Sequence, residues 1–436
     1  MESETQPMGR RVAYWRQRRG MSQQVFADRI GKSKSWVDKI ERGVRRLDKY
    51  SVITELAEAL SIDAGQLLGR EPKRRPGLGG CLDQVEVESI RQSLERYERL
   101  GRFLEAAPIE STPIPELRGS VNYCWLAFEK GHYPVVARSL IQLLRDTPVA
   151  EDRPVGGTSA DAAELMTQVY QIASTVLRKL GEAQLAWLAA DRAISAANRG
   201  NDPLLAGIAT TRVSNALRAL GRHQAALDLN VQVAHGLISE TGGENSTPAQ
   251  ISVYGALLLQ GAMAAALAGD STTSEDLLDS ASRAANILGR DANYYYTSFG
   301  PTNVLLHRAA AFVELGEGSD ALAVHDRIPP AALADLVAER RAHHHLDMTR
   351  ACVQVGDMER ASRHLVTADR HAPAEVRCRP VAIELIDQIL HRTKGEPAQD
   401  LRRLAEEVGA LNLGGPGGPQ AAAIRPVRPL AALSDL

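Results

Sequence analysis

The sequence is poor in aromatic residues and has no long apolar run. The second shortage argues against a membrane-spanning protein. Aromatic residues make up 4% of the 436 residues, and no segment approaches the roughly 18 consecutive apolar residues of a membrane span. The start, Met1-Glu-Ser-Glu, lacks the basic and then apolar pattern of an export signal. We therefore expect a cytoplasmic protein that has no membrane contact.

Patterns for catalysis and metal binding are also missing. The cysteines form no CxxC pair, which argues against a zinc site or a disulfide framework and favours ordinary, mostly buried thiols. They are Cys81, Cys124, Cys352 and Cys378. His343, His344 and His345 are consecutive, so on a helix they point in different directions and make no joint metal site. Because no set of catalytic groups stands in a suitable context, we predict a protein that is not an enzyme and holds neither cofactor nor metal.

A formal net charge of −2 conceals an asymmetry along the chain. Residues 1–75 hold 17 lysines and arginines against 10 acidic residues, whereas the remainder holds 34 against 43. A basic segment suits a polyanion such as DNA, and a net-negative segment does not. We therefore expect the N-terminal part to bind nucleic acid.

Residues 21–43 are typical of two short helices joined by a turn at Gly31. Ser22 can cap the first helix and Ser33 the second. The inward residues are expected to be Val25, Phe26 and Ile30 in the first helix, and Val37 and Ile40 in the second. The outer face of the second helix is basic and hydrogen-bonding, as the major groove of DNA requires. We predict a helix-turn-helix whose second helix contacts the bases.

This stretch resembles the DNA-binding domain of the Xre and lambdoid phage repressor (Cro/C1) family. The correspondence runs through Ser22-Gln23, Ala27, Gly31, Ser33, Val37, Ile40, Glu41 and Gly43, then Leu56-Ala57, Ala59-Leu60 and Leu67-Leu68. The resemblance implies that Gln23 grips a phosphate, and that residues early in the second helix meet base edges. Trp36 replaces a small residue of the family, and it lies either against a sugar or thymine methyl or over the domain edge. The candidate DNA-binding residues are Gln23, Ser33, Lys34, Ser35, Trp36, Lys39, Arg42, Arg45 and Arg46, with Arg10 and Arg11 as further phosphate contacts.

Composition sets the other boundaries. Residues 1–69 form the helix-turn-helix domain, and residues 70–81, with repeated Pro and Gly among basic residues, form a flexible linker. Residues 82–119 contain a helix with a regular apolar seam, which fits a coiled-coil dimer contact or, as we favour, packing on the larger domain. Residues 395–436 are expected to be a short helix and a disordered tail.

Residues 120–394 repeat a pattern of two amphipathic helices separated by a glycine. The glycines are Gly131, Gly181, Gly221, Gly269, Gly316 and Gly356. A small or modest residue stands five positions after each glycine and seven before it, as two closely crossing helices require. These residues are Val136, Ala186, Ala226, Ser274, Ala321 and Ala361 after it, and Cys124, Ser174, Ser214, Ala262, Ala309 and Thr349 before it. The pattern resembles the tetratricopeptide (TPR) repeat, although the glycines lie about 40 to 50 residues apart rather than the usual 34 or so.

The predicted fold class is all-α, a lambda-repressor-like helix-turn-helix domain followed by a TPR-like α-solenoid. The first helix of each pair lines the concave wall of such a solenoid. The wall positions that we predict to bind a ligand are Arg178, Arg212, Asn215, Arg218, Gln260, Asn303 and His307. Arg212, Asn215 and Arg218 share one helix face that suits a peptide bond and a carboxylate or phosphate, but such residues also bridge neighbouring repeats.

A helix-turn-helix followed by TPR-like repeats is the plan of the peptide-sensing regulators of Gram-positive bacteria, the Rap, Rgg, NprR, PlcR and PrgX group. It also resembles the Xre-TPR regulators of actinobacteria. The resemblance implies a sequence-specific transcriptional regulator that acts as a homodimer on an inverted-repeat operator in double-stranded DNA. Its repeat domain would sense a peptide or small signalling ligand. The alternative is a DNA-anchored scaffold whose repeats bind a partner regulator.

Overall fold

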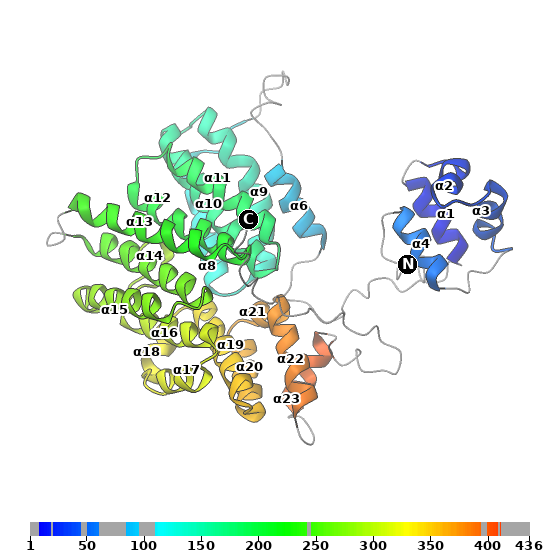
Figure 1. The fold of residues 1–436 in the computed structure, drawn as a ribbon. Helices are drawn as coiled ribbons and strands as arrows, with labels where there is room; N and C mark the ends of the chain where they lie inside the picture. Colours follow the sequence, from blue (N-terminus) through cyan, green and yellow to red (C-terminus); the bar gives the residue numbers. More distant parts are fainter. Residues whose placement is uncertain are drawn as a thin grey trace, which may run out of the picture. The chain divides into compact units, whose positions relative to one another are not determined.

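The protein is described from a computed structural model, in which the chain forms two compact units, Met1–Gly77 and Leu78–Leu436 (Figure 1). The structure describes residues 8–18, 21–44, 50–60, 84–95, 110–241, 246–393, 399–408 and 410. Within these ranges the regular elements are helices, and an isolated bridge joins Ala292 and Phe299. The all-α prediction is therefore confirmed. The predicted linker at 70–81 and the tail beyond residue 410 lie outside the described residues.

The first unit contains helices around one small apolar core. They are α1 (Met8–Arg18), α2 (Gln23–Arg29), α3 (Lys34–Glu41) and α4 (Tyr50–Leu60). Ser22 and Ser33 cap α2 and α3, each accepting a hydrogen bond at 3.2 Å from the amide of the third residue onward. A Cβ on Gly9 would come within 2.0 Å of the Ile40 carbonyl oxygen, so glycine allows α1 to approach the end of α3. The predicted caps and turn are confirmed.

One predicted core residue of this unit is wrong. Val25 is 53% exposed, whereas Phe26 and Ala27 are buried and Ile30 follows them one turn later. Phe26 and Ile30, four residues apart, define the inward face of the short helix α2. Val25 lies about 100° away from Phe26 around the axis and therefore faces outward.

The second unit begins with α6 (Gln84–Glu95), which packs on the repeats. Ile90 and Leu94 are fully buried in the same apolar cluster as α8 and α9, and Val87 packs against that cluster. The favoured interpretation of this helix, packing on the larger domain, is confirmed for the described residues.

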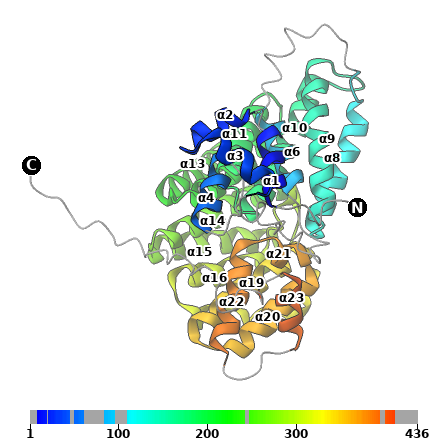
Figure 2. The same ribbon diagram turned by 90° about the vertical axis from the view of Figure 1, so that its right-hand side faces the viewer.

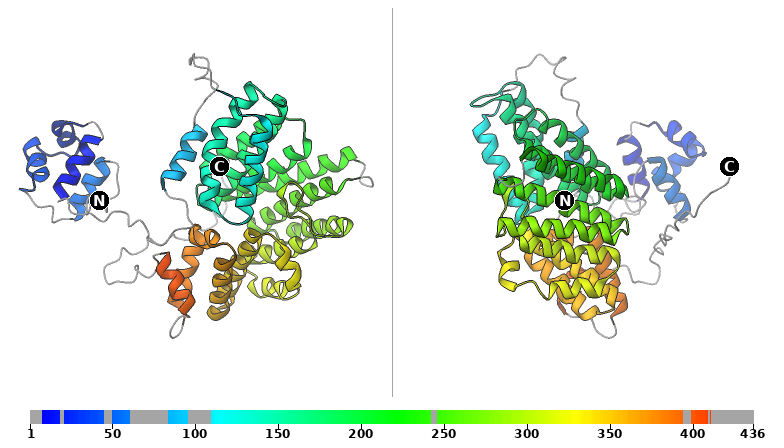
Figure 3. Two further views of the ribbon diagram at one scale, coloured as in Figure 1. Left: turned by 180° about the vertical axis from the view of Figure 1, so that it is seen from behind. Right: turned by 60° about the vertical axis from the view of Figure 1, so that its left-hand side comes forward.

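Antiparallel helix pairs follow one another along the rest of the second unit, and Figures 2 and 3 show the same succession from other sides. The pairs are α8 (Ile114–Glu129) with α9 (Tyr133–Asp152), α10 (Ser159–Lys179) with α11 (Ala183–Ala197), α12 (Pro203–Ala219) with α13 (His223–Thr241), α14 (Pro248–Leu267) with α15 (Ser271–Leu288), α16 (Pro301–Leu315) with α17 (Gly318–His325), and α19 (Ala338–Val355) with α20 (Met358–His371). The additional elements are η1 (Tyr294–Tyr296), α18 (Pro330–Asp335), α21 (Pro373–Arg377), α22 (Pro380–Arg392) and α23 (Gln399–Glu407).

The pattern of glycines and small residues marks these pairs as predicted. All six glycines have a positive φ, between 71° and 87°, which glycine adopts without steric cost. The residues five positions after them and seven positions before them are all buried. In the second pair, for example, the Ser174 hydroxyl donates to the Ala186 carbonyl at 2.9 Å. The helices of a pair therefore cross at these small side chains.

The repeats are longer than the usual 34 or so residues, and much of the additional length is helical. Helices α10 and α14 have 21 and 20 residues, and the fifth pair is extended by the short helix α18. Helices α9 and α13 are similarly long, with 20 and 19 residues. The longer helices widen each repeat.

The first and last parts of the repeat unit are in contact. The Tyr133 hydroxyl, at the start of α9, donates to the Glu375 carboxylate of α21. Ala374 and Cys378 belong to the apolar cluster of the first two pairs, and α8 contacts α19. The first and last parts of the repeat unit therefore meet at one side of the space that the inner helices line.

Helix α14 is long and apolar enough, by length and composition, to cross a membrane. An 18-residue window of it is 72% buried within the protein, and a core helix of this kind passes the same test. Among the cysteines, Cys124 and Cys352 are free and buried, whereas Cys378 is disulfide-bonded. The expectation of ordinary thiols is therefore wrong at Cys378, because spacing along the sequence does not report which thiols meet in space.

Candidate functional site

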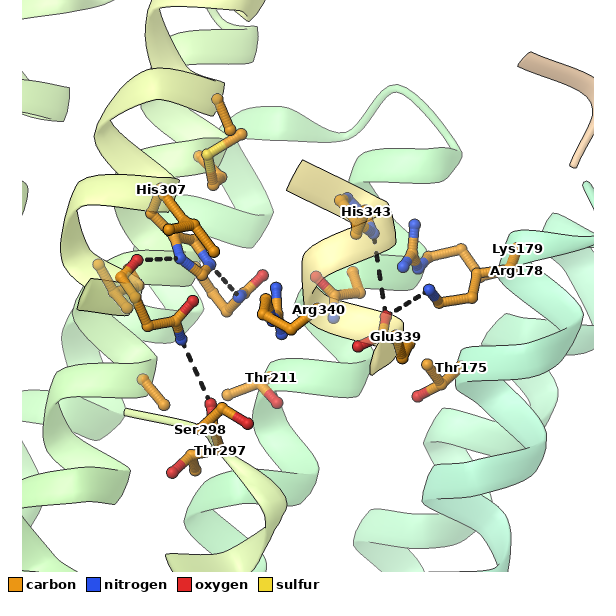
Figure 4. A pocket seen from close by; sticks show the side chains of 18 of the residues that line it. Thr175, Arg178, Lys179, Thr211, Thr297, Ser298, His307, Glu339, Arg340 and His343 are labelled. Carbon is orange, nitrogen blue, oxygen red and sulfur yellow. Dashed lines mark hydrogen bonds and ion pairs between the residues drawn. The ribbon is translucent and has the colours of Figure 1, made fainter. Parts of the chain in front are cut away.

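A cavity of about 310 Å³ lies among the inner helices of the repeat unit (Figure 4). Its wall is formed by α8, α10, α12, α14, α16 and α19, together with the segment from η1 to Ser298. All seven positions selected from the repeat register line it. They are Arg178, Arg212, Asn215, Arg218, Gln260, Asn303 and His307. The structure thus brings together residues from four helices that are up to 129 positions apart in the chain.

Part of this set forms a hydrogen-bonded bridge between neighbouring repeats. Arg218 donates to the side-chain oxygens of Asn215 and Gln260, the second at 2.7 Å. The Nε2 atoms of Gln260 and His307 lie 3.4 Å apart, and His307 Nδ1 lies 2.9 Å from the Asn303 carbonyl oxygen. Because a carbonyl only accepts, Nδ1 carries the proton and Nε2 accepts from Gln260. Arg218 therefore bridges neighbouring repeats, which is one of the two roles that the sequence left open for it.

His307 is neutral in this environment. Burial, with repulsion from Arg340 and Arg218, lowers its pKa to about 3. A neutral imidazole fits its place in the bridge, where it both donates and accepts.

The carboxylates at one end of the cavity are engaged with cations. Lys179 Nζ lies 2.5 Å from both Glu339 Oε1 and Glu375 Oε1, and Arg379 donates to Glu375 at 2.8 Å. Burial alone would raise the pKa of Glu339, but Lys179 and Arg340 lower it to about 2, so it remains ionised. These carboxylates have no charge left to neutralise further arginines.

A second pairing occupies the carboxylates of α16 and α19. Arg350 donates to both oxygens of Glu314, at 2.7 and 2.9 Å, and its Nη1 lies 3.8 Å from Asp347. Glu129, on α8, accepts a hydrogen bond from Asn293 at 2.6 Å. Within the described residues, the acidic groups of the cavity wall are thus already partnered.

Three arginines of the wall have no such partner among the described residues. Arg178 (α10), Arg212 (α12) and Arg340 (α19) make no ion pair there, and the Nε atom of each is buried without a hydrogen bond. Burial, with repulsion from Arg178 and Arg340, lowers the pKa of Arg212 to about 10. Burial, with repulsion from Arg379 and Arg340, lowers the pKa of Arg178 to about 10. Figure 4 shows Arg340 between the side that carries His307 and the side that carries Arg178 and Lys179.

The sequence interpretation missed several charged residues of this wall. Lys179, Glu339, Arg340, His343 and Arg379 were not selected. A signal was present in α19, where Glu339, His343, Asp347 and Arg350 recur at steps of three and four residues and so share one face. Arg379 follows the last helix pair and carried no such signal.

One group in the cavity has the donor types of a metal site. Atoms of Glu339, His343 and Glu375 lie within 4.8 Å of one another. However, the Lys179 ammonium already lies 2.5 Å from an oxygen of each carboxylate. The amino group therefore takes the place that a metal ion would occupy.

The three consecutive histidines point to different neighbours, as expected, but two of them join a larger cluster. His344 Nε2 lies 2.9 Å from His325 Nδ1, and His345 Nδ1 lies 3.0 Å from His364 Nδ1. His371 stacks on His345 with ring centroids 5.6 Å apart. Sequence spacing did not indicate this cluster, because α17, α19 and α20 each supply part of it.

In the first unit, the outer face of α3 is open to solvent. Lys34, Ser35 and Lys39 are exposed, whereas Val37 and Ile40 are buried beneath them. Ser33 is exposed and its hydroxyl caps the helix. The three exposed side chains therefore lie on a surface that a DNA groove could meet, with the helix held from behind by the core.

Several of the other DNA-binding candidates are engaged in contacts within the domain. Gln23 donates to Glu41 at 2.9 Å, Trp36 packs against the core of the domain, and Arg42 forms an ion pair with Asp38 at 3.2 Å. Arg10 is exposed and Arg11 is half-buried on α1. Arg45 and Arg46 lie outside the described residues.

A family model matches the first unit, and a solved structure is loosely similar to a larger part of the chain. Residues 7–68 match the family model described as "Helix-turn-helix domain". No curated protein matches the chain. Among solved structures, the chain is similar to Bacillus thuringiensis PlcR in complex with the peptide PapR7 and DNA, at 13% identity and a TM-score of 0.30, over 74% of this chain and 92% of that one. A superposition with so low a TM-score supports no conclusion about what this chain binds. With the capped helices, the glycine turn and the exposed face of α3, the family match identifies the N-terminal unit as a helix-turn-helix DNA-binding domain.

Proposed function

We propose that the chain is a cytoplasmic, sequence-specific transcriptional regulator that binds an inverted-repeat operator as a homodimer. The observation that carries this proposal is the exposed face of α3, where Lys34, Ser35 and Lys39 project from a folded helix-turn-helix. Such a helix presents donors to base edges and cations to phosphates. Two copies would contact half-sites about one helical turn of DNA, or a multiple of it, apart.

The repeat domain is the sensor in this proposal. Its cavity is lined by convergent polar side chains and by unpartnered arginines, which is the composition of a ligand site and not of an apolar core. A ligand that prefers one shape of the repeat domain by about 1.4 kcal/mol would change the population of that shape tenfold. The ligand would thereby alter operator occupancy.

Genome-wide mapping of binding sites in the host, followed by salt-dependent binding of the full chain to a recovered sequence, tests the proposal. We expect discrete peaks that share an inverted repeat. The variant Lys34→Ala/Lys39→Ala should lose about 2 kcal/mol or more of operator binding, because each good base contact is worth about 1–3 kcal/mol. Lys130→Ala, an exposed lysine of the repeat domain, is the matched control and should bind normally.

Two results would overturn it. If the double variant bound its operator as well as the control did, α3 would not be the helix that contacts the bases. If enrichment were diffuse, independent of sequence and lost steeply with salt, the DNA domain would only anchor the chain, and a protein partner of the repeats would carry the function.

A further inference from the structure

The three unpartnered arginines of the cavity come from three different helices. Arg178 is the next-to-last residue of α10, Arg212 lies within α12, and Arg340 lies in the first turn of α19. Each guanidinium has a buried Nε without a hydrogen bond, although such groups are nearly always satisfied in folded proteins. Holding three like charges around one space is unfavourable unless something of opposite charge enters it.

Within the described residues the protein supplies only part of that charge, because Glu339 attracts Arg178 and Arg212 while its carboxylate contacts Lys179. The carboxylates Glu314, Glu339 and Glu375 are paired with Arg350, Lys179 and Arg379. Counting Glu375 behind the wall, seven lysine and arginine side chains face five acidic ones. The cations are Arg178, Lys179, Arg212, Arg218, Arg340, Arg350 and Arg379, and the acids are Glu129, Glu314, Glu339, Asp347 and Glu375. By formal charge, the site therefore holds two more cationic than acidic side chains.

A phosphate monoester meets this demand better than a carboxylate does. It carries about 1.5 to 2 negative charges at neutral pH and three acceptor oxygens, so it can bind three guanidinium groups at once. A carboxylate brings one charge and two oxygens, which would leave an arginine unpaired. The hydroxyls of Thr175 and Thr211 also line the wall, but they donate to the carbonyl oxygens of Gln171 and Ile208, so the arginines are the donors available to the phosphate.

A second orphaned group points to the rest of the ligand. Asn303 is 1% exposed and lines the cavity, and its Oδ1 has no hydrogen-bond partner, while its Nδ2 lies 3.4 Å from the Thr297 carbonyl oxygen. An unpaired buried acceptor calls for a donor such as a hydroxyl or amino group. The apolar residues Ile208, Leu259 and Leu306 complete the wall near it.

The cavity also limits the size of what it can hold. A volume of about 310 Å³ stands at the small end of ligand sites, which span roughly 300–1,000 Å³. This volume suits a compact molecule.

We propose that the repeat domain binds a compact phosphorylated small molecule, with Arg178, Arg212 and Arg340 holding its phosphate and Asn303 accepting a hydrogen bond from a hydroxyl or amino group elsewhere on it. The inference rests on the proposed sensor function and names its ligand class. It assigns the phosphate, rather than a peptide carboxylate, as the recognised group.

Thermal unfolding and calorimetric titration of the full chain, with orthophosphate and with acetate at matched ionic strength, test the inference. We expect orthophosphate to raise the Tm of the repeat domain and acetate to have a much smaller effect. In Arg178→Met/Arg212→Met the apolar stem of each side chain is retained and the charge is removed. Phosphate affinity should fall at least about tenfold for each arginine lost. Arg222→Met, an exposed arginine outside the cavity, should bind as the parent chain does.

Folding is controlled in the same experiment. Removing like charges that repel one another should leave the Tm of the ligand-free double variant undiminished. The variant Lys34→Ala/Lys39→Ala should keep its phosphate response, which separates the cavity from the DNA domain. Unchanged phosphate binding in Arg178→Met/Arg212→Met, an equal response to acetate, or no response of the parent chain to orthophosphate would each overturn the inference.

The outcomes also distinguish this inference from the proposed function. Specific operator binding without a phosphate response would retain the regulator and reject the ligand class. A phosphate response that depends on Arg178 and Arg212, in a chain that recognises no operator, would do the reverse.

Discussion

Lys179 and Glu339 are 160 residues apart in the sequence, yet their Nζ and Oε1 atoms lie 2.5 Å apart inside the repeat domain. Glu375 shares the same ammonium at 2.5 Å. All three side chains are almost wholly buried. This triad joins the second helix pair to the last one, and it forms one end of the cavity.

Lys179→Met should destabilise the repeat domain by about 3–5 kcal/mol, because buried Glu339 loses the ammonium that it contacts and buried Glu375 keeps only Arg379. The measurement is urea unfolding of the full chain. Arg363→Met, which breaks an exposed ion pair with Glu359, is the control and should cost less than about 1 kcal/mol. A cost for Lys179→Met equal to that of the control would mean that the triad does not hold the two regions together.

The histidine cluster should make the fold sensitive to acid. Burial, followed by repulsion from neighbouring histidines, lowers the pKa of His345 to about 3 and that of His364 to about 4. Arg341 and Arg360 face the cluster and act in the same direction, whereas Asp326 opposes them at His364. An unfolded histidine takes up a proton near pH 6.5, so the unfolded chain binds more protons below that pH. Stability is therefore complete above pH 6.5 and falls as the pH decreases toward 4.

The check is the Tm between pH 7.5 and 5. His345→Gln/His364→Gln should flatten the decline, since each replaced histidine removes up to about 1.4 kcal/mol per pH unit in this window. His391→Gln, at an exposed histidine of α22, should leave the slope unchanged. An equal slope in all three proteins would place the acid sensitivity elsewhere.

The small residues at the helix crossings should not tolerate enlargement. Ala186→Leu inserts a larger side chain where α11 meets α10, at the contact between Ser174 and the Ala186 carbonyl, and should cost at least about 1–3 kcal/mol. Gln184→Leu adds similar apolar bulk at an exposed position of the same helix and should change stability by less than about 0.5 kcal/mol. Chemical unfolding compares the two, and equal effects would show that the crossing has room to spare.

Ser33 allows helix capping to be separated from DNA contact. Ser33→Ala removes the acceptor for the Trp36 amide and should weaken α3 by about 0.5–2 kcal/mol. Ser33→Asp keeps an acceptor and should restore the helix, but its charge should lower operator affinity because DNA phosphates are negative. Hydrogen exchange of the α3 amides and operator titration measure the two effects. Equal operator binding by Ser33→Asp and the parent chain would place Ser33 away from the phosphates.

The features that could be predicted from the sequence are local ones. A cap such as Ser33 or a turn glycine such as Gly181 acts on residues within one helical turn, so the residue type and its spacing are sufficient to predict it. The cavity wall was predicted as far as the repeat register extends, from Arg178 to His307. Lys179 and Glu375 could not be paired in advance, because their contact depends on how six helix pairs add up in space. The same holds for His345 and His364, since nothing in their spacing shows that α19 and α20 aim these rings at each other.

Contact between Tyr133 and Glu375 has a consequence for how the repeat domain folds. In an open solenoid each repeat touches only its neighbours, so folding can begin anywhere and partly folded forms can persist. Here residues 242 positions apart must meet before the first and last pairs complete their packing. Such distant contacts slow folding, and this one ties the first helix pair to the segment after the last. During synthesis the cavity wall is completed only after α21 has left the ribosome, because Arg379, which lines the cavity, follows that helix.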